Sequence, residues 1–288
     1  MINKNLFSLN NQQLKICFNV KFIAVSFYVL AICGSAFSQQ EKIELKHAKE
    51  LSGKVIDGQE VREAIGNVEF VQGNVKVFCN SALQYIKSNR VELRGDVRMY
   101  QDTLSLFTSK ANYFGDDRKA ICEGGVTLKD PNATLRADNG VYSFNDTKAI
   151  FNGDVIVINP DYRITAGNLT YFRNNEDSFA KINVIVTTDS AVIKADNIDF
   201  YKRQGKSFAY GNVFIESDST VIYSDTATNY SVEKKSIASG GVKIISMNNA
   251  AVITGNSLEN YETENFTIVK GNVKLVQTKE NEDTVHIY

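Results

Sequence analysis

Apolar and polar side chains alternate along much of the chain, and this alternation defines short strands. In one run the apolar positions are Ala149, Phe151, Val155 and Val157, and Asp154 is one of the polar residues between them. A period of two places these apolar side chains on one face of a strand. One face is therefore expected to be buried and the other solvated, which is typical of an antiparallel sheet or a β-solenoid wall.

The runs recur at a fixed distance, each around a Gly-Asp/Asn/Gly-Val triplet. Successive triplets begin at positions 95, 124, 153, 182, 211 and 240, so the step between neighbours is always the same. In the triplet at 182, Ile182 replaces the glycine. Further triplets begin at Gly73, after which the step is shorter, and at Gly271, before which it is longer. The repeat predicts a stack of similar units with about 29 residues each.

The triplet glycine has two interpretations. Gly-Asp and Gly-Asn are ordinary turn dipeptides, but the apolar alternation continues through the triplet without a change of phase. We therefore favour an inward position where two walls approach too closely for a side chain, or a position where the strand kinks. Under the first of these, Ile182 marks a unit with more room.

A second strand completes each unit and ends in an aromatic residue. Ala195 and Ile198 stand at positions of opposite parity, so a straight strand would place them on opposite faces. A bulge or corner at Asp196-Asn197 would bring both to the interior. We interpret the closing aromatic residues as one packed stack, made of Tyr85, Tyr113, Tyr142, Tyr171, Phe200, Tyr230 and Tyr261.

The N-terminal segment, residues 1–38, predicts a signal peptide. It holds Lys4, Lys15 and Lys21 without an acidic residue, then an apolar run, then Ala36 and Ser38 at the positions that signal peptidase prefers. Lipoprotein processing at Cys33 is the alternative to cleavage after Ser38. We assign residues 1–38 to the signal peptide, 39–52 to an N-terminal lead-in and 53–288 to a single β domain.

Composition adds little chemistry to this picture. After removal of the signal, (32 − 3) basic residues against 33 acidic ones give a net charge of −4, which does not suit nucleic acid. His47 and His286 lie near opposite ends, and no metal or cofactor is expected. The carboxylates recur at one phase of the repeat, where turn and bulge chemistry accounts for them, so we do not expect an enzyme. Cys79 and Cys122 could pair in an oxidising compartment, but free, packed thiols are favoured.

Several segments of the chain form recognisable motifs. They are the run from Gly73 to Tyr85 and the later Gly95-Asp96-Val97, Asp102-Thr103-Leu104, Tyr113-Phe114-Gly115 and Asn159-Pro160-Asp161-Tyr162. Together they resemble the OstA-like family, which includes relatives of the periplasmic lipopolysaccharide-transport bridge and of the N-terminal domain of the organic solvent tolerance protein. The resemblance implies an all-β, repetitive antiparallel β-jelly-roll that is open along one side and holds lipid A acyl chains. It also implies head-to-tail assembly with other jelly-roll proteins, or with copies of itself, in the periplasm between the two membranes.

The residue pattern and the resemblance together predict a lipid carrier. The inward positions expected to contact acyl chains are Val97, Val126, Leu128, Val155, Val157, Val184, Val186, Val213, Ile215, Val242 and Ile244. The final segment repeats the start of an earlier strand and is expected to be an assembly edge, comprising Thr284, Val285, His286, Ile287 and Tyr288. The alternative function is a β-solenoid for adhesion or carbohydrate binding, which would usually place aromatic residues on its outer face.

Overall fold

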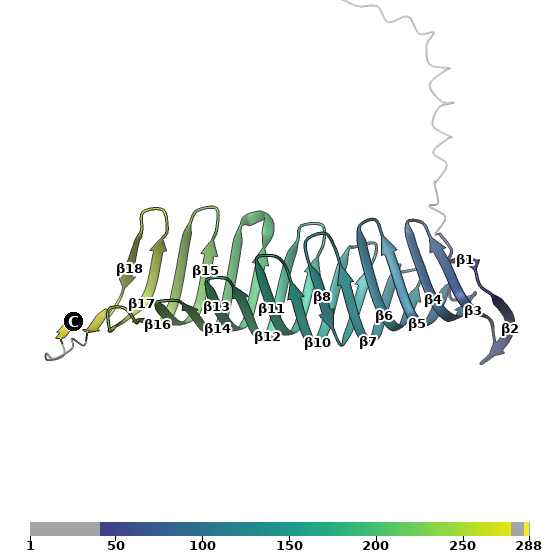
Figure 1. Ribbon diagram of the computed structural model, residues 1–288, viewed down its shortest axis with the longest axis horizontal. Coiled ribbons are helices and arrows are strands. Elements are labelled where there is room, and N and C mark those ends of the chain that lie inside the picture. Colours follow the sequence, from purple (N-terminus) through teal and green to yellow (C-terminus); the bar gives the residue numbers. More distant parts are fainter. Residues whose placement is uncertain (1–40, 278–284, 288) are drawn as a thin grey trace, which may run out of the picture. The chain divides into compact units, whose positions relative to one another are not determined.

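A computed structural model describes residues 41–277 and 285–287 of the chain. The predicted signal peptide, Thr284 and Tyr288 lie outside the described residues. These described residues form one compact unit, which is an all-β structure built from a single antiparallel sheet. Figure 1 shows the strands side by side along the long axis, with β1 and β2 at one end and β18 near the other.

Twenty strands make up the sheet, and most pair with their neighbours in sequence. Their bounds are β1 Glu44–His47, β2 Glu50–Ile56, β3 Gln59–Gln72, β4 Val75–Tyr85, β5 Arg90–Gln101, β6 Leu104–Phe114, β7 Lys119–Lys129, β8 Thr134–Ala137, β9 Asn139–Ser143, β10 Lys148–Ile158, β11 Tyr162–Phe172, β12 Asp177–Thr188, β13 Ala191–Tyr201, β14 Lys206–Ser217, β15 Thr220–Tyr230, β16 Lys235–Ser246, β17 Ala251–Tyr261, β18 Phe266–Lys270, β19 Lys274–Gln277 and β20 Val285–Ile287. The predicted repeating unit is thus a pair of long strands. The sheet already includes β1 and the start of β2, within the segment assigned to a lead-in.

Each long strand bends at its middle, at the triplet or opposite one. Between β5 and β6 the register shifts from Arg94↔Lys110 to Val97↔Thr108, so Gly95 and Asp96 together face one residue of β6. Both have left-handed backbones, with φ of 73° and 44°. This bulge turns the strand, so one half of it lies in one wall of the fold and the other half in the facing wall.

The triplet glycines lie on the outside of this bend. A Cβ on Gly153 would stand 2.3 Å from Oδ2 of Asp138, which lies between the neighbouring strands β8 and β9, and Gly153 has a φ of +79°. At Gly95, Gly124, Gly153, Gly211 and Gly240 the predicted kink is confirmed, and so is the lack of room for a side chain. The prediction is wrong for Gly73-Asn74, which is an ordinary turn between β3 and β4. The inward position is wrong, because the glycine meets a polar side chain at the outer corner rather than the opposite wall.

Ile182 keeps the same bend by an exchange with its neighbour. It has a φ of 69°, and a Cβ on Gly167 of the preceding strand would lie 2.9 Å from the Cβ of Ile182. In other units the glycine is in the triplet, and the larger residue, such as Asp138 or Asp196, stands at the position that faces it. In this unit the two residue types are exchanged. Ile182 is 54% exposed, so it marks no roomier interior, and that prediction is wrong.

The second strand turns its corner without an extra residue of its own. Ala195 and Ile198 are both buried, as predicted, with Asp196 exposed between them. The register with β12 runs from Val184↔Ala195 to Lys181↔Asn197. The additional residue therefore belongs to β12, at Ile182-Asn183, and not to the Asp196-Asn197 pair.

The closing aromatic residues divide into two groups. Tyr113 and Tyr142 are fully buried, and Tyr171 and Phe200 are half-buried and pack against the core. These four follow the regular step of the repeat. Three others fall out of that step and stand on the outer face beneath a cation, namely Tyr85 under Arg90, Tyr230 under Lys206 and Tyr261 under Lys235. The prediction of a single stack is therefore wrong, because a departure from the step by an odd number of positions reverses the face of the strand.

Candidate functional site

The predicted interior positions face inward. Asp154, Asn183 and Asn212, the polar residues between them, are exposed as expected. Ile215 is half-buried, and the other ten are buried, namely Val97, Val126, Leu128, Val155, Val157, Val184, Val186, Val213, Val242 and Ile244. Their orientation is confirmed, and contact with lipid stays a prediction.

The interior is bounded by two rows of loops where the walls end. Row A comprises residues 86–89, 115–118, 144–147, 173–176, 202–205, 231–234 and 262–265. Row B comprises residues 73–74, 102–103, 130–133, 159–161, 189–190, 218–219 and 247–250. We call the line between them the seam. Whether the interior is accessible depends on the contacts across it.

In the N-terminal half the seam is closed by buried glutamines. Gln72, at the end of β3, donates a hydrogen bond to the carbonyl oxygen of Gly115 in row A (2.8 Å) and accepts one from the hydroxyl of Tyr113 (2.7 Å). Gln101, one unit later, donates to the carbonyl oxygen of Phe144 (3.2 Å). Both glutamines are buried, so these bonds join the two rows in a low-dielectric environment where losing them is costly.

Two arginines of row A reinforce this closed part of the seam. Arg118 donates to Oδ1 of Asn74 (2.6 Å), and Arg173 donates to the hydroxyl of Thr103 (2.8 Å). Both bonds are exposed, so water competes for their donors and acceptors. They therefore contribute less to closure than the buried glutamine bonds.

A short segment before β1 seals the N-terminal end of the interior. Ile43 is 6% exposed and belongs to the main core. Its amide donates to Oδ1 of Asn89 (3.1 Å), and its carbonyl oxygen accepts from Nε2 of Gln84 (3.1 Å). Gln72 also donates to the carbonyl oxygen of Glu41. We call residues 41–43 the strap.

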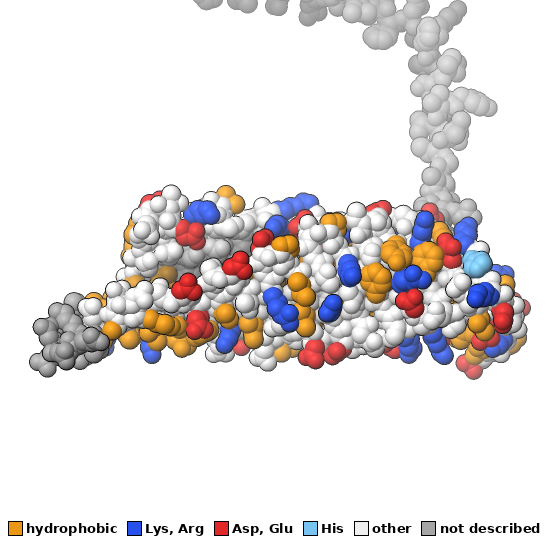
Figure 2. All heavy atoms as spheres, in the orientation of Figure 1, with side chains coloured by type: hydrophobic (Ala, Val, Ile, Leu, Met, Phe, Trp, Pro, Cys, Tyr) orange, Lys and Arg blue, Asp and Glu red, His pale blue; other side chains and the backbone are white. Residues whose placement is uncertain are grey.

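The hydrogen bonds across the seam stop near the middle of the described chain. Along row B the last acceptor is Oδ2 of Asp130, which receives the hydroxyl of Tyr171 (2.9 Å). One stacked ring pair follows, Tyr162 and Phe200, with centroids 6.4 Å apart. Figure 2 shows the hollow between the walls toward the C-terminal end.

One position of the repeat accounts for this change. Residues 72, 101 and 130 are Gln, Gln and Asp, and all three bond across the seam. At 159 the same position holds Asn159, which donates to the carbonyl oxygen of Asn132 within row B. At 188 and 217 it holds Thr188 and Ser217. These shorter side chains donate instead to Ala191 and Thr220 of their own turns. The two rows are thus joined at Gln72, Gln101 and Asp130, which we call the clasps, and the later residues at this position bond within row B or their own turns instead.

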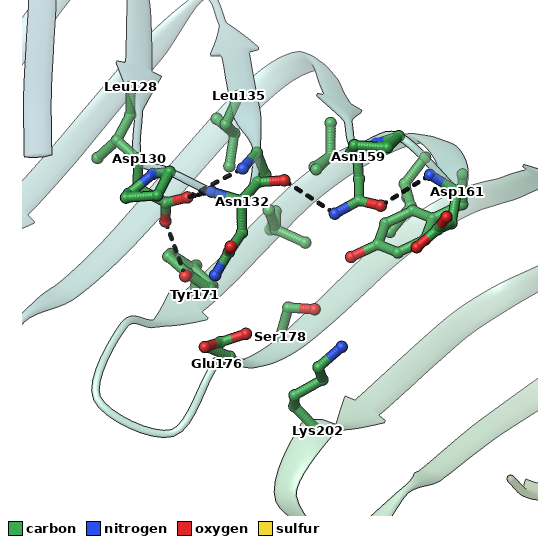
Figure 3. A pocket seen from close by; sticks show the side chains of 17 residues that line it. Leu128, Asp130, Asn132, Leu135, Asn159, Asp161, Tyr171, Glu176, Ser178 and Lys202 are labelled. Carbon is green, nitrogen blue, oxygen red and sulfur yellow. Dashed lines mark hydrogen bonds between the residues drawn. The ribbon is translucent and has the colours of Figure 1, made fainter. Parts of the chain in front are cut away.

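A cavity of about 410 Å³ lies where the clasps end, and we call it the mouth. Figure 3 shows Leu128 and Leu135 near its floor, with Asn132, Asn159 and Asp161 along row B. Glu176, Ser178 and Lys202 lie on the opposite side, from row A and the adjoining strand. The floor is apolar and also includes Val157, Ile164 and Leu169.

The rim of the mouth is acidic. Asp130, Asp161 and Glu176 line it with a single cation, Lys202. Burial raises the pKa of Tyr171, and the charge of Asp130 raises it further. Burial likewise raises the pKa of Tyr162, with Glu176 and Asp130 as further causes. The rim therefore disfavours an anion in the mouth itself, whereas its floor suits hydrocarbon.

Beyond the mouth the inward side chains are less covered. Ile193, Phe200, Ile215 and Ala227 are half-buried against the main core. Ile222 and Ile253 are half-buried against a separate core cluster around Val242 and Leu258. The C-terminal half therefore presents apolar surface along the open seam.

Residues of the usual catalytic and metal-binding types do not assemble into a further site in the described part. Among residues 41–277 and 285–287, no three His, Cys, Asp or Glu side chains converge to hold a metal. Cys79 and Cys122 are free and buried, as favoured from the sequence. No described helix is long and apolar enough to cross a membrane.

Both ends of the sheet leave an edge strand. At the C-terminal end, β20 pairs with β19 through Val276↔His286, so Val285, His286 and Ile287 of the predicted assembly edge do form a strand. At the N-terminal end, β2 pairs with β3 along its whole length. Its side chains are largely exposed, including Leu51 at 57% and Val55 at 73%.

Sequence reasoning missed the clasps and the strap. Gln72 and Gln101 stand one repeat unit apart at the inward end of a strand, and this repeated polar residue was an available signal. For Ile43 we find no such signal, because it precedes the first repeat.

The fold and the interior define an all-β jelly-roll with an apolar core that opens along part of one side. Residues 40–139 match the family described as OstA-like protein. The match covers the N-terminal part of the chain and supports the resemblance that the sequence motifs indicated.

Other comparisons add a distant structural likeness. A crystal structure of LptH, the LptA-homologous periplasmic component of the lipopolysaccharide transport device of Pseudomonas aeruginosa, aligns with a TM-score of 0.24 and 11% identity over 54% of this chain and 94% of that chain. No curated protein matches the sequence.

Proposed function

We propose that this protein is an exported lipid carrier that holds the acyl chains of lipopolysaccharide in its interior on their way to the outer membrane. The observation that carries the proposal is the apolar interior, which is closed in one half and exposed along the seam in the other. The OstA-like match supports the same class of function. A dozen methylene groups moved from water into such an interior gain on the order of 10 kcal/mol.

The proposal places the carrier in the periplasm, with other jelly-roll proteins or further copies as partners. β2 and β20 are unpaired along one side within the described chain, and such edges recruit a strand from a partner. A strand added at β20 would continue the walls beyond the open half. Lipid could then pass between molecules without crossing water.

The direct test is photo-cross-linking in cells. A photoreactive amino acid at Ile215 or Ile222 should cross-link to lipopolysaccharide, whereas one at Phe214, which is paired with Tyr223 on the outer face, should not. Cross-linking at neither inward position, with the protein folded and exported, would contradict the proposal.

One observation favours a second function, carbohydrate binding on the outer face. Aromatic rings do stand there beneath cations, as for Lys119 over Phe114 and Lys148 over Phe172, and aromatic faces with adjacent charges suit acidic sugars. A glycan array distinguishes the two functions. Carbohydrate binding predicts a glycan ligand that is lost when Phe114→Ala and Phe172→Ala are combined, whereas the carrier proposal predicts no such ligand.

A further inference from the structure

We propose that a hydrocarbon chain enters at the mouth and lies only between the mouth and the C-terminal end, so that the interior is blind at its N-terminal end. This inference rests on the proposed carrier function and specifies where in the molecule the ligand binds. The ligand would therefore occupy only one half of the interior and not a groove along the whole length of the fold.

The N-terminal half has no room for a ligand because its own side chains fill it. Tyr113 and Tyr142 are at most 1% exposed, and Phe144 is at 2%. The Phe144 ring packs edge-to-face on both, at centroid distances of 5.8 and 4.7 Å. A chain entering this half would have to displace three aromatic rings from a packed core, which is strongly unfavourable.

The strap closes the end of this half. Ile43 is inserted into the core, and its backbone is held on both sides by Asn89 and Gln84. The carbonyl oxygen of Asn89 accepts from the amide of Gly115 at 2.8 Å, which extends the network to the next loop of row A. A ligand leaving through this end would break several buried hydrogen bonds at once, each costing about 1–3 kcal/mol.

The mouth has the opposite properties. Its volume of about 410 Å³ is within the range of small-molecule pockets. Its floor is formed by aliphatic side chains that continue into the exposed interior beyond Ile193. Because the rim carries three carboxylates and one lysine, the end of an alkyl chain fits there better than a phosphorylated head group.

The experiment uses the wild-type protein and a fatty acid with a photoreactive diazirine at its terminal carbon. After irradiation, mass spectrometry locates the labelled residues, and purified lipopolysaccharide is added in parallel as a competitor. We expect competitor-sensitive labelling at the mouth and along β13 to β17, with less than a tenth of that yield in β4 to β6. Comparable labelling of β4 to β6 would overturn the blind end while leaving the carrier proposal intact.

Other outcomes separate the two proposals. Labelling that is absent, confined to the outer face or insensitive to lipopolysaccharide would overturn both. A Gln72→Ser variant that melts cooperatively should raise labelling of β4 to β6 above the wild-type yield, because it releases the Tyr113 ring and the strap residue Glu41, both of which block this half. Ser217→Ala, at the same repeat position in the open half, should leave the pattern unchanged. If Gln72→Ser does not fold, the labelling pattern of the wild-type protein by itself tests whether the N-terminal end is blind.

Discussion

The two halves of the molecule are built from the same repeat but differ in how their walls meet. In the N-terminal half, glutamines and tyrosines bond across the seam and rings fill the interior. In the C-terminal half, Thr188 and Ser217 bond within their own turns, and aliphatic side chains such as Ile222 remain half-buried. The bonding partner of the side chain at one repeat position, across the seam or within its own row, thus distinguishes the packed half from the open half.

The largest effect should come from a buried charge placed in each half. Val97 is fully buried in the closed half, so Val97→Asp should destabilise the fold by about 4 kcal/mol or more. Ile222→Asp should cost much less, because water reaches the open half, but should abolish lipid capture. Thermal melting and lipopolysaccharide binding measure the two effects. Equal losses of stability would mean that the halves do not differ in access to water.

Alkaline pH should weaken the closed half in particular. Burial raises the pKa of Cys79 to about 11 and that of Cys122 to about 12, from 9.0. The unfolded chain therefore loses these protons first, and the free energy of unfolding falls as pH rises from about 9 to about 12. At about 1.4 kcal/mol per pKa unit, Cys122 alone should account for about 3 kcal/mol of this fall by pH 11. Melting from pH 8 to 11 should show a shallower decline for Cys122→Ala, and identical slopes would contradict the assignment.

Removing one clasp should lower the free energy of unfolding by less than Val97→Asp or alkaline pH does. Gln72→Ser deletes bonds to two carbonyl oxygens and to the Tyr113 hydroxyl, leaving buried groups unpaired, so we expect a loss of about 2 kcal/mol. Ser217→Ala removes one partly buried bond at the same repeat position and should cost no more than about 0.5 kcal/mol. Chemical denaturation of both variants measures the difference. Similar losses would show that the clasp does not stabilise the closed half.

Much of this fold could be predicted from the alternation and the constant repeat step, because both report directly on which side chains face inward. The facing of Val155 and Val184 follows from period two alone. The clasps could not be predicted in the same way, because a bond such as Gln72 to Gly115 depends on how the walls twist together between residues far apart in the sequence. The sequence also could not predict that the glycines lie on the outside of the bend. Glycine has no side chain, so its place in the periodic pattern does not show which side of the bend it faces.

The smallest effect concerns the bend near the border of the two halves. Ile182 is β-branched and has a φ of 69°, a conformation that costs about 1–2 kcal/mol. Ile182→Gly relieves this strain but adds glycine flexibility to the unfolded chain and loses the contact with Gly167, so we expect a net gain of roughly 0.5 kcal/mol. Ile185→Gly, on the same strand after the bulge, has no such strain and should destabilise. The melting temperatures of the two variants test this prediction. A lower melting temperature in both would show that the contact of Ile182 with Gly167 stabilises the bend more than the backbone strain destabilises it.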